Sequence, residues 1–349
     1  MPAPTPVDRS DALSPRLALF QLITGHYVSR AIYVAAKLDI ASLMAAGPRR
    51  VEDLAAATGT HAPSLNRLLR LLASAGVVAE TDFGCFGLTP LGECLRSDQS
   101  GSSHAVALLF AGPMMRAWDE LLYAVRTGEP TFERVLGTDP FRYMGEHPDE
   151  AAVFNAAMTA ASTHTAKGVP EAYDFSSFRT VIDVGGGHGV LLASILAANP
   201  GVTGVLFELP HVAEGARKAL AEQGLQQRCK IAAGDFFQSV PEGGDAYILK
   251  SVIHDWDDAR SITILKNCRR AMAPGGKLLL VELVLPARVD HSPRAQIGTG
   301  SDINMLVNIG GRERTDRDFS ELFLAAGVKL TRIVPVPGSL SSILEGVPV

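Results

Sequence analysis

The sequence has 349 residues, of which 47% are hydrophobic and 20% are charged, a balance that excludes a disordered chain and a fibrous one. At about 150 residues per domain, this length predicts two or three domains. The formal net charge is −5, from 32 basic and 37 acidic residues, which disfavours a dedicated nucleic-acid-binding protein because such proteins usually carry a basic face.

The cysteines and the apolar segments bear on metal binding and on compartment. None of the four cysteines lies in a C-x-x-C pair, so we expect neither a zinc site nor a disulfide framework. The first fifteen residues lack the apolar stretch of a signal peptide. The longest apolar run, Leu278 to Ala287, contains Glu282 and is too short to span a bilayer. We therefore expect a cytoplasmic protein that binds neither a membrane nor a metal ion.

The chain is expected to begin with a flexible leader, because residues 1–14 are rich in proline and polar side chains. From Leu17 to about Ala46, apolar residues recur at helical spacing. Residues 17–46 carry more apolar surface than a small domain can bury alone. This surplus predicts a homodimer that forms through the N-terminal helices.

A winged helix is predicted over residues 15–99. The segment APSLNRLLRLLASAG places leucines at i, i+3, i+4 and i+7, the apolar stripe of a buried helix. Pro63 suits the first turn of that helix and Gly76 suits its end. The segment VEDLAAATG precedes it as a second helix, and two short extended segments follow at 77–81 and 85–88.

The rest of the chain is predicted to hold a helical region and then an α/β domain. Residues 100–175 are mostly helical in pattern and rich in methionine and aromatic side chains, as expected of a linker and substrate-pocket region. Within residues 176–349, short apolar runs alternate with helical stretches, which predicts a parallel, doubly wound, Rossmann-like sheet. The predicted strands are 180–184, 204–208, 229–234, 245–250, 277–285 and 328–336.

A glycine-rich turn follows the first of these strands, in the segment VIDVGGGHG. Glycines there let the backbone pass close to a ligand at the start of a helix. A dinucleotide-binding turn starting at Gly185 would need its third glycine at position 190, which is Val190. The spacing present, Asp183-x-Gly185-x-Gly187-x-Gly189, resembles the first motif of class I S-adenosylmethionine (SAM) methyltransferases. A tight turn without a ligand is the alternative.

A further acid ends the next predicted strand, and another follows the strand after it. Glu208 lies 19 residues beyond Gly189, where a carboxylate can accept both hydroxyls of a ribose. Asp235, in the segment GDFF, can accept from an adenine amine, and Phe236 can pack on the ring. Because open α/β sheets bind ligands at the carboxyl edge of their strands, these residues together predict a SAM site.

At this point the chain resembles the cation-independent small-molecule O-methyltransferases, which include the plant caffeate and flavonoid type and bacterial relatives in antibiotic biosynthesis. The resemblance covers about residues 15–345. It rests on six ordered motifs: VIDVGGGHG, FELP, GDFF, ILKSVIHDWDD, LVELVLP and DINMLVNIGGRERTDRDFSELFLAAGV. It implies an N-terminal domain that dimerises and helps to wall the substrate pocket, and a C-terminal domain that holds SAM.

The resemblance also implies site residues. His254 of the H-D-W motif would be the general base, flanked by Glu282 and Glu313, and Lys250 and Ser251 match cofactor-contacting positions. A neutral imidazole suits this role because it can take the proton of a phenol, whose pKa is about 10. Candidates for the substrate pocket, from family position and side-chain character, are Phe110, Met114, Trp118, Phe141, Met158, Met305 and Asn308.

Three residues near these motifs are interpreted differently. Asp255 and Asp257 are expected to cap or order the loop around the histidine rather than to act in catalysis. His188 stands inside the glycine turn where we expect Thr, Ser or Asn. Its contact with the cofactor is left open.

The predicted function is SAM-dependent O-methylation of a hydroxyl, most simply a phenolic one, on an aromatic product of secondary metabolism. The substrate, the position methylated and the choice between an oxygen and a nitrogen acceptor stay open. One alternative is an N-methyltransferase, and another is a SAM-binding relative that catalyses hydroxylation or decarboxylation without methyl transfer. A winged-helix DNA-binding regulator is disfavoured, because DNA affinity requires cations and the net charge is negative.

Overall fold

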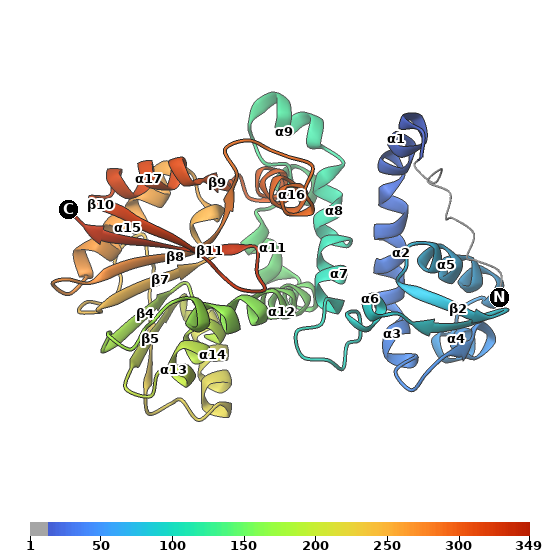
Figure 1. Cartoon of the computed structure of the whole chain (residues 1–349), viewed down its shortest axis with the longest axis horizontal. Coiled ribbons are helices and arrows are strands. Elements are labelled where there is room, and N and C mark those ends of the chain that lie inside the picture. Colours follow the sequence, from blue (N-terminus) through green and yellow to red (C-terminus); the bar gives the residue numbers. More distant parts are fainter. Residues whose placement is uncertain (1–12) are drawn as a thin grey trace, which may run out of the picture. The chain divides into compact units, whose positions relative to one another are not determined.

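The computed structural model describes residues 13–349, apart from the side chains at positions 113, 141 and 211. Most of the predicted leader therefore lies outside the described residues. The chain divides into two compact units, the first ending at Gly112 and the second running from Pro113 to Val349 (Figure 1). The predicted domain boundaries near residues 99 and 175 stay predictions, because the structural division lies between these two positions.

The first unit is mainly helical, with a small antiparallel sheet in the order β1-β3-β2. The predicted succession of two helices and a strand pair is present as α4, α5, β2 and β3. Leu54, Leu69 and Phe86 are fully buried in its core. In chain order its elements are α1 (Pro15–Ile23), α2 (Gly25–Lys37), α3 (Ile40–Leu43), β1 (Arg49–Arg50), α4 (Val51–Thr58), α5 (Ala62–Ser74), β2 (Val78–Asp82), β3 (Cys85–Leu88), α6 (Pro90–Glu93) and α7 (His104–Phe110).

Helix α1 leaves its apolar side chains uncovered. No residue of this helix is buried, although its sequence PRLALFQLI is almost entirely apolar. Its exposed apolar side chains are Leu17, Leu19, Phe20, Leu22 and Ile23. Exposure of so many large apolar groups on one helix is typical of a surface that another molecule covers.

The second unit begins with helices α8 (Pro113–Trp118), α9 (Leu121–Thr127), α10 (Phe132–Leu136), α11 (Pro140–Glu146) and α12 (Pro148–Ala172). Strands and helices then alternate, as the sequence predicts. These elements are β4 (Thr180–Val184), α13 (Val190–Ala198), β5 (Thr203–Glu208), α14 (Pro210–Glu222), β6 (Cys229–Ala233), β7 (Ala246–Lys250), the 3-10 helix η1 (Ile253–Asp255), α15 (Asp258–Ala271), β8 (Lys277–Leu285), α16 (Pro293–Asn308), β9 (Arg314–Thr315), α17 (Asp316–Ala325), β10 (Val328–Pro335) and β11 (Ser341–Pro348).

The large sheet has the strand order β10-β11-β8-β7-β4-β5-β6, and β9 pairs with β8 off this path. The pairs β4–β5, β4–β7, β5–β6 and β7–β8 are parallel, which confirms the predicted doubly wound arrangement for this part of the sheet. The other end of the sheet departs from this parallel arrangement. There β11 runs antiparallel to both β8 and β10.

Strand β11 was absent from the sequence prediction because polar residues and a glycine interrupt its apolar pattern. Its residues Ser342 and Glu345 are polar but buried. A side chain at Gly346 would place its Cβ 2.5 Å from Val328, so a glycine is required where β10 and β11 pack closely. The Pro-Gly step at residues 337–338, between two extended segments, is the sequence signal for this hairpin.

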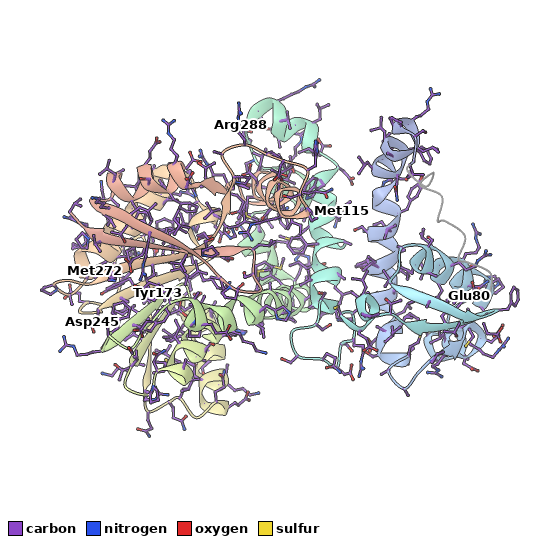
Figure 2. The ribbon with its side chains drawn as sticks, viewed as in Figure 1. Glu80, Met115, Tyr173, Asp245, Met272 and Arg288 are labelled. Carbon is purple, nitrogen blue, oxygen red and sulfur yellow. The ribbon has the colours of Figure 1, made fainter. Side chains whose placement is uncertain are left out.

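Helices cover both faces of the large sheet (Figure 1). One hydrophobic cluster joins the sheet to α12, α13 and α14, and a second joins it to α15 and α17. Side chains fill both layers, and Tyr173 and Asp245, labelled in Figure 2, lie near the amino ends of the central strands. The carboxyl ends of β4, β5, β6 and β7 therefore form the opposite, open edge. No helix in the described part of the chain has the length and apolar character to cross a membrane.

Candidate active site

The glycine turn joins β4 to α13 at the open edge of the sheet. Gly185, Gly187 and Gly189 all have positive φ angles, of 69°, 58° and 78°. The N–H of Gly185 donates to the carbonyl of Phe207 at 2.8 Å, which ties the turn to the end of β5. A Cβ at Gly185 would lie 3.0 Å from Val252, so the spacing of the glycines meets a backbone requirement and leaves the turn open to a ligand.

Asp183 is a buried carboxylate directly before this turn. Its exposed fraction is 0%, and neither of its oxygens has a hydrogen-bond partner among the described residues. Burial raises the pKa of Asp183 to about 7, and the nearby Lys250 acts in the opposite direction. A buried acid without a partner is costly, so the site fits a ligand that brings positive charge or N–H donors.

Glu208 and Asp235 stand at the carboxyl ends of β5 and β6, as predicted. Glu208 accepts from the N–H of Gly187 at 3.2 Å and from that of Leu209 at 2.6 Å. Asp235 accepts from the N–H of Phe237 at 2.9 Å and thereby orders the GDFF turn. Each carboxylate retains acceptor capacity, since every oxygen offers two lone pairs. The two acids therefore fit the polar groups of a nucleoside.

Phe236 provides an apolar wall next to the glycine turn. A Cβ at Gly185 would lie 3.6 Å from its ring. The rings of Phe236 and Trp256 meet edge to face with their centroids 6.1 Å apart. Sequence reasoning had not assigned Trp256 to the site, although it belongs to the H-D-W motif. Its place beside Phe236 links the open edge of the sheet to the loop around His254, residues 251–257, which we call the histidine loop.

Lys250 ends strand β7 and Ser251 follows it, between these acids and the histidine. Burial lowers the pKa of Lys250, while the charges of Glu282, Asp183 and Asp255 oppose this effect. Ser251 has a φ of 52°, in the left-handed region that non-glycine residues rarely adopt. Strain of this kind is typical of functional sites.

His254, in η1, lies among three carboxylates. Its Nδ1 is 3.1 Å from Oε1 of Glu313 and 3.9 Å from Oε2 of Glu282. Its Nε2 is 3.3 Å from Oδ1 of Asp255. The structure thus brings the three predicted catalytic residues together, and Glu313 is the direct hydrogen-bond partner of the ring.

These carboxylates control the protonation of the ring. Burial acts to lower the pKa of His254, but the charges of Glu282, Asp255 and Glu313 outweigh it and raise this pKa to about 10. Burial also raises the pKa values of Glu282 and Asp255, against the opposing charge of His254. The three carboxylates therefore favour the protonated form of the ring before any ligand binds.

Glu282 also shapes the histidine loop. Its Oε1 accepts from the N–H groups of Val252 and Ile253, at 3.0 and 2.9 Å. Asp257 caps helix α15 by accepting from the N–H of Arg260, as its interpretation as a capping acid predicts. Asp255, interpreted in the same way, instead contacts the ring of His254.

Two residues of α16 that sequence reasoning missed hold Glu313. The hydroxyl of Ser301 donates to Oε1 of Glu313 at 2.7 Å, and Asp302 accepts from its backbone N–H at 2.9 Å. Asp302 opens the segment DINMLVNIGGRERT and Ser301 directly precedes it, and polar residues among apolar ones are the sequence signal there. Ser301 contacts the same carboxylate oxygen that faces the imidazole, and Asp302 holds the backbone of Glu313.

The same triad raises the question of a metal ion. His254, Glu282 and Glu313 each offer a ligand atom within 4.8 Å of the others, and such a group can hold a cation. In the structure, Nδ1 of His254 faces Glu313, while Oε1 of Glu282 is occupied by two backbone N–H groups. A protonated imidazole supplies the positive charge that this arrangement requires.

The predicted pocket residues divide between the two units. Phe110 lies in α7 of the first unit and is partly exposed. In the second unit Met114 is buried, and Met158 and Met305 are half-buried. Phe141 lies in α11, with its side chain outside the described set.

The polar pair Trp118 and Asn308 is linked through Asn304. The indole N–H of Trp118 donates to Oδ1 of Asn304 at 3.1 Å, and Nδ2 of Asn308 donates to the same oxygen at 2.9 Å. Asn308 is 1% exposed, and its own Oδ1 has no hydrogen-bond partner among the described residues. This oxygen is an acceptor that a bound molecule can use.

Comparison with known proteins gives two family matches. Residues 118–329 match the family model of the O-methyltransferase domain, and residues 20–98 match that of the O-methyltransferase dimerisation domain. These ranges fall on the two sides of the structural division after Gly112.

Individual proteins are similar over nearly the full chain. A phenazine O-methyltransferase from Lysobacter antibioticus is 47% identical over 98% of this chain and 99% of its own. An 8-amino-8-demethylriboflavin N,N-dimethyltransferase from Streptomyces davaonensis is 36% identical over 94% of each. The crystal structure of an O-methyltransferase from neocarzinostatin biosynthesis, in complex with SAM and 2-hydroxy-5-methyl naphthoic acid, superposes with a TM-score of 0.79 at 33% identity, covering 97% of this chain and all of that one.

Proposed function

The chain belongs to the O-methyltransferase family, and from that premise we propose that it methylates an aromatic hydroxyl with His254 as the general base. It is a SAM-dependent O-methyltransferase with a dimerisation domain at its N-terminal end. The observation that carries the proposal for the base is the position of His254 between Glu313, at 3.1 Å, and Glu282, at 3.9 Å.

The residues at the open edge of the sheet fit SAM. We propose that Asp183, Lys250 and Ser251 bind its charged amino-acid part, since neither oxygen of Asp183 has a hydrogen-bond partner among the described residues. Glu208 accepts from the ribose hydroxyls, and Asp235 and Phe236 hold the adenine. The open backbone at Gly185 and Gly187 lets the cofactor approach. When bound, SAM supplies an electrophilic methyl group on its sulfonium sulfur.

The proton is the central problem for the residues of this chain. A phenol with a pKa of about 10 and an imidazolium whose pKa is about 10 both hold a proton at neutral pH. One of these two protons must leave before the oxygen can attack. A cation bound nearby disfavours a second positive charge, so the pKa of His254 is expected to fall when SAM binds.

The neutral ring can then take the substrate proton. Nε2 of His254 faces Asp255, and we propose that the substrate hydroxyl takes the place of this carboxylate at Nε2. Glu313 keeps the Nδ1–H tautomer in place and stabilises the imidazolium once the proton has moved. Alignment of the oxygen with the methyl group supplies the rest of the rate, because in-line displacement depends on proximity.

The similar proteins indicate the class of acceptor. They are named for phenazines and for a naphthoic acid bound in the crystal, all flat aromatic molecules. Met114, Met158 and Met305 can adapt to such rings, since methionine makes favourable contacts with aromatic faces. We propose a polycyclic phenol of secondary metabolism as the substrate.

A nitrogen acceptor is the second candidate, because one relative is an N,N-dimethyltransferase at 36% identity. An aromatic amine needs less help from a base than a phenol does. The buried triad around His254 favours oxygen, since it provides the proton acceptor that only a phenol requires. The two acceptors can be separated with a matched pair, 1-hydroxyphenazine and 1-aminophenazine, assayed with the wild type and with His254→Ala.

We also propose a homodimer that forms through α1. The helix exposes Leu17, Phe20 and Ile23, and it lies at the start of the dimerisation domain. A second copy of the chain is the occupant that this domain assignment favours.

The experiment that tests the proposed function is a mass-spectrometric screen of hydroxylated phenazines and naphthoates with SAM. Methylation on oxygen, lost in His254→Ala and retained in Arg228→Lys, is the expected result. Arg228 binds backbone carbonyls at the end of α13 and belongs to no part of the site. Equal methylation by both variants would contradict the assignment of the base.

A further inference from the structure

Arg314 is the largest side chain that the core buries completely. Its side-chain exposure is 0%, although it carries a permanent positive charge. Burial of a charge is unfavourable unless it is paired and hydrogen-bonded, so a fully buried arginine indicates a specific task. Arg314 lies in the strongly charged segment RERTDRD, whose composition gives no sign of this burial.

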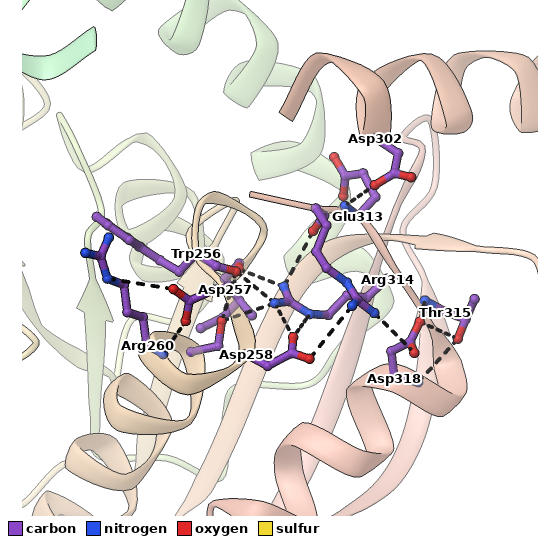
Figure 3. A network of polar contacts seen from close by, with 12 residues as sticks. Trp256, Asp257, Asp258, Arg260, Asp302, Glu313, Arg314, Thr315 and Asp318 are labelled. Carbon is purple, nitrogen blue, oxygen red and sulfur yellow. Dashed lines mark hydrogen bonds and ion pairs between the residues drawn. The ribbon is translucent and has the colours of Figure 1, made fainter. Parts of the chain in front are cut away.

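The guanidinium binds the backbone on both sides of His254. Nη1 donates to the carbonyl of Ile253 at 2.9 Å, and Nη2 donates to the carbonyl of Trp256 at 2.8 Å (Figure 3). These two carbonyls flank the catalytic loop that η1 forms. The planar, forked guanidinium group of arginine presents N–H donors in fixed directions and can therefore bind two acceptors at once. The ammonium group of lysine does not present its donors in this fixed arrangement.

The rest of the guanidinium is anchored from α15. Nε and Nη2 both donate to Oδ1 of Asp258, at 3.1 and 2.7 Å, and Nη2 lies 3.4 Å from the hydroxyl of Ser261 (Figure 3). Asp258 is half-exposed, whereas the guanidinium is enclosed. Asp258 therefore neutralises the charge of the guanidinium, while Nη1 and Nη2 donate hydrogen bonds to the backbone of the histidine loop.

The same segment carries the partner of the imidazole. Glu313 is the residue before Arg314, and the N–H of Arg312 donates to the carbonyl of His254 at 2.8 Å. A Cβ at Gly311 would lie 2.1 Å from that carbonyl oxygen, so the chain passes close against the histidine there. Segment 311–314 and the histidine loop are thus joined by several bonds.

We propose that Arg314 is a positioning residue that sets the contact between His254 and Glu313. Its hydrogen bonds to the carbonyls of Ile253 and Trp256 fix the position of the histidine loop. Because Arg314 directly follows Glu313 in the chain, the same bonds also fix the position of the glutamate. The contact between the imidazole and Glu313 is then a property of one rigid unit that contains both segments.

The charged groups around the ring come from several elements. Glu282 on β8, Glu313 next to β9 and Asp255 in η1 face the ring, while Lys250 on β7 and Asp302 on α16 act on those carboxylates. Asp258 is not among the groups that shift the pKa of His254. Arg314→Lys keeps the positive charge, so its effect on the ring is expected to come through geometry, whereas Asp258→Asn also removes the charge that pairs the guanidinium.

The test is titration of the His254 imidazole by NMR in the full-length protein, with no substrate present. Arg314→Lys keeps the charge but loses the fork, so the contact with Glu313 should loosen and the pKa of His254 should fall by about one unit. Asp258→Asn should act in the same direction, and it tests the anchor if the lysine variant does not fold. Affinity for S-adenosylhomocysteine should stay within about twofold.

The matched control is Arg228→Lys, whose arginine also binds backbone carbonyls but far along α13 from the glycine turn. It should lower the melting temperature and leave the His254 titration unchanged. If the folded Arg314 and Asp258 variants behave like this control, Arg314 only stabilises the fold and the proposal is wrong. A parallel loss of S-adenosylhomocysteine binding would also overturn it, since that result indicates general damage to the site.

The role proposed for Arg314 rests on the proposed function, in which His254 is the general base. The NMR titration that tests this role does not depend on that function. The titration reports the contact between His254 and Glu313 whether or not the ring acts as a base. With a phenol that the enzyme turns over, Arg314→Lys should lower kcat by up to about 10²-fold at nearly unchanged KM, because misplacement of about 1 Å has that effect.

Discussion

Nδ1 of His254 lies 3.1 Å from Oε1 of Glu313, although 59 positions separate the two residues in the chain. The loop after β7 and the segment that leads into β9 meet at the open edge of the sheet to create this contact. It fixes which nitrogen of the ring faces Glu313, while Nε2 lies 3.3 Å from Asp255, the carboxylate that the substrate hydroxyl would displace in the proposed mechanism.

Replacement of the two glutamates should separate their contributions. Glu313→Gln removes the charge at 3.1 Å and Glu282→Gln the charge at 3.9 Å, so both should lower the pKa of His254. A lower pKa frees the imidazole at lower pH, so the rising limb of the profile of kcat/KM against pH should move toward acid. The maximal rate should fall by about tenfold or more, because the imidazolium loses its stabilisation.

The control for this pair is Glu345→Gln, which removes another buried carboxylate from the same sheet. Lys277 and Arg332 bind Glu345, and the pKa of Glu345 is about 2. Its loss should destabilise the protein and leave the pH profile in place. A profile that shifts equally in all three variants would contradict the assignment of the glutamates.

Asp183 should make cofactor binding depend on pH. Its pKa is about 7 in the free protein, and the ammonium group of bound S-adenosylhomocysteine favours its ionised form. Affinity for S-adenosylhomocysteine should therefore rise as the pH increases through about 7 and then level off. Calorimetry at several pH values should show this rise in the wild type and its loss in Asp183→Asn.

The asparagine variant should also bind about 10- to 100-fold more weakly, the usual effect of losing a charged hydrogen bond. Asp245→Asn is the control, since Asp245 accepts from the N–H of Thr180 at the other end of β4. If Asp183→Asn binds like the wild type at every pH, this acid does not contact the cofactor.

The sequence predicted most of the second unit because parallel strands that are buried on both faces are continuous apolar runs. Motifs at their ends then located Asp183, Glu208 and His254 on one edge. Strand β11 escaped prediction because Glu345 and Gly346 interrupt its pattern. Their roles, an ion pair and a close strand contact, exist only in the folded sheet.

Other parts of the site depend on contacts that spacing cannot show. Arg314 lies in a strongly charged segment, yet the backbone carbonyls of the histidine loop supply partners that allow its burial. Asp255 has the sequence context of a capping acid, and only the 3-10 geometry of η1 turns it toward Nε2 of His254. Long-range polar contacts of this kind leave no periodic signal in a sequence.

Substitution in α1 should break the dimer. Phe20→Glu places a charge on the exposed apolar face of this helix, where a second copy would have to bury it. Light scattering at micromolar concentration should show a dimer for the wild type and a monomer for the variant. Phe83→Glu is the control, because Phe83 is even more exposed, at 88%, but lies between β2 and β3. A monomeric wild type would count against the proposed homodimer.

Removal of metal ions should leave the reaction intact. The protonated His254 provides the positive charge among Glu282 and Glu313, so no cation is needed there. Turnover of a phenol that the enzyme methylates should be equal before and after dialysis against EDTA. Loss of activity that magnesium restores would mean that the triad binds a metal ion instead.

The most direct test of the account is the pH dependence of methyl transfer by His254→Ala, compared with its affinity for S-adenosylhomocysteine. At neutral pH, turnover of the phenol identified by the screen should fall by about 10²- to 10⁴-fold, the usual contribution of a general base. The defect should shrink as the pH approaches the pKa of the phenol, since solvent then removes the proton. Cofactor affinity should change little. Wild-type turnover by this variant at neutral pH would contradict the assignment of His254 as the base.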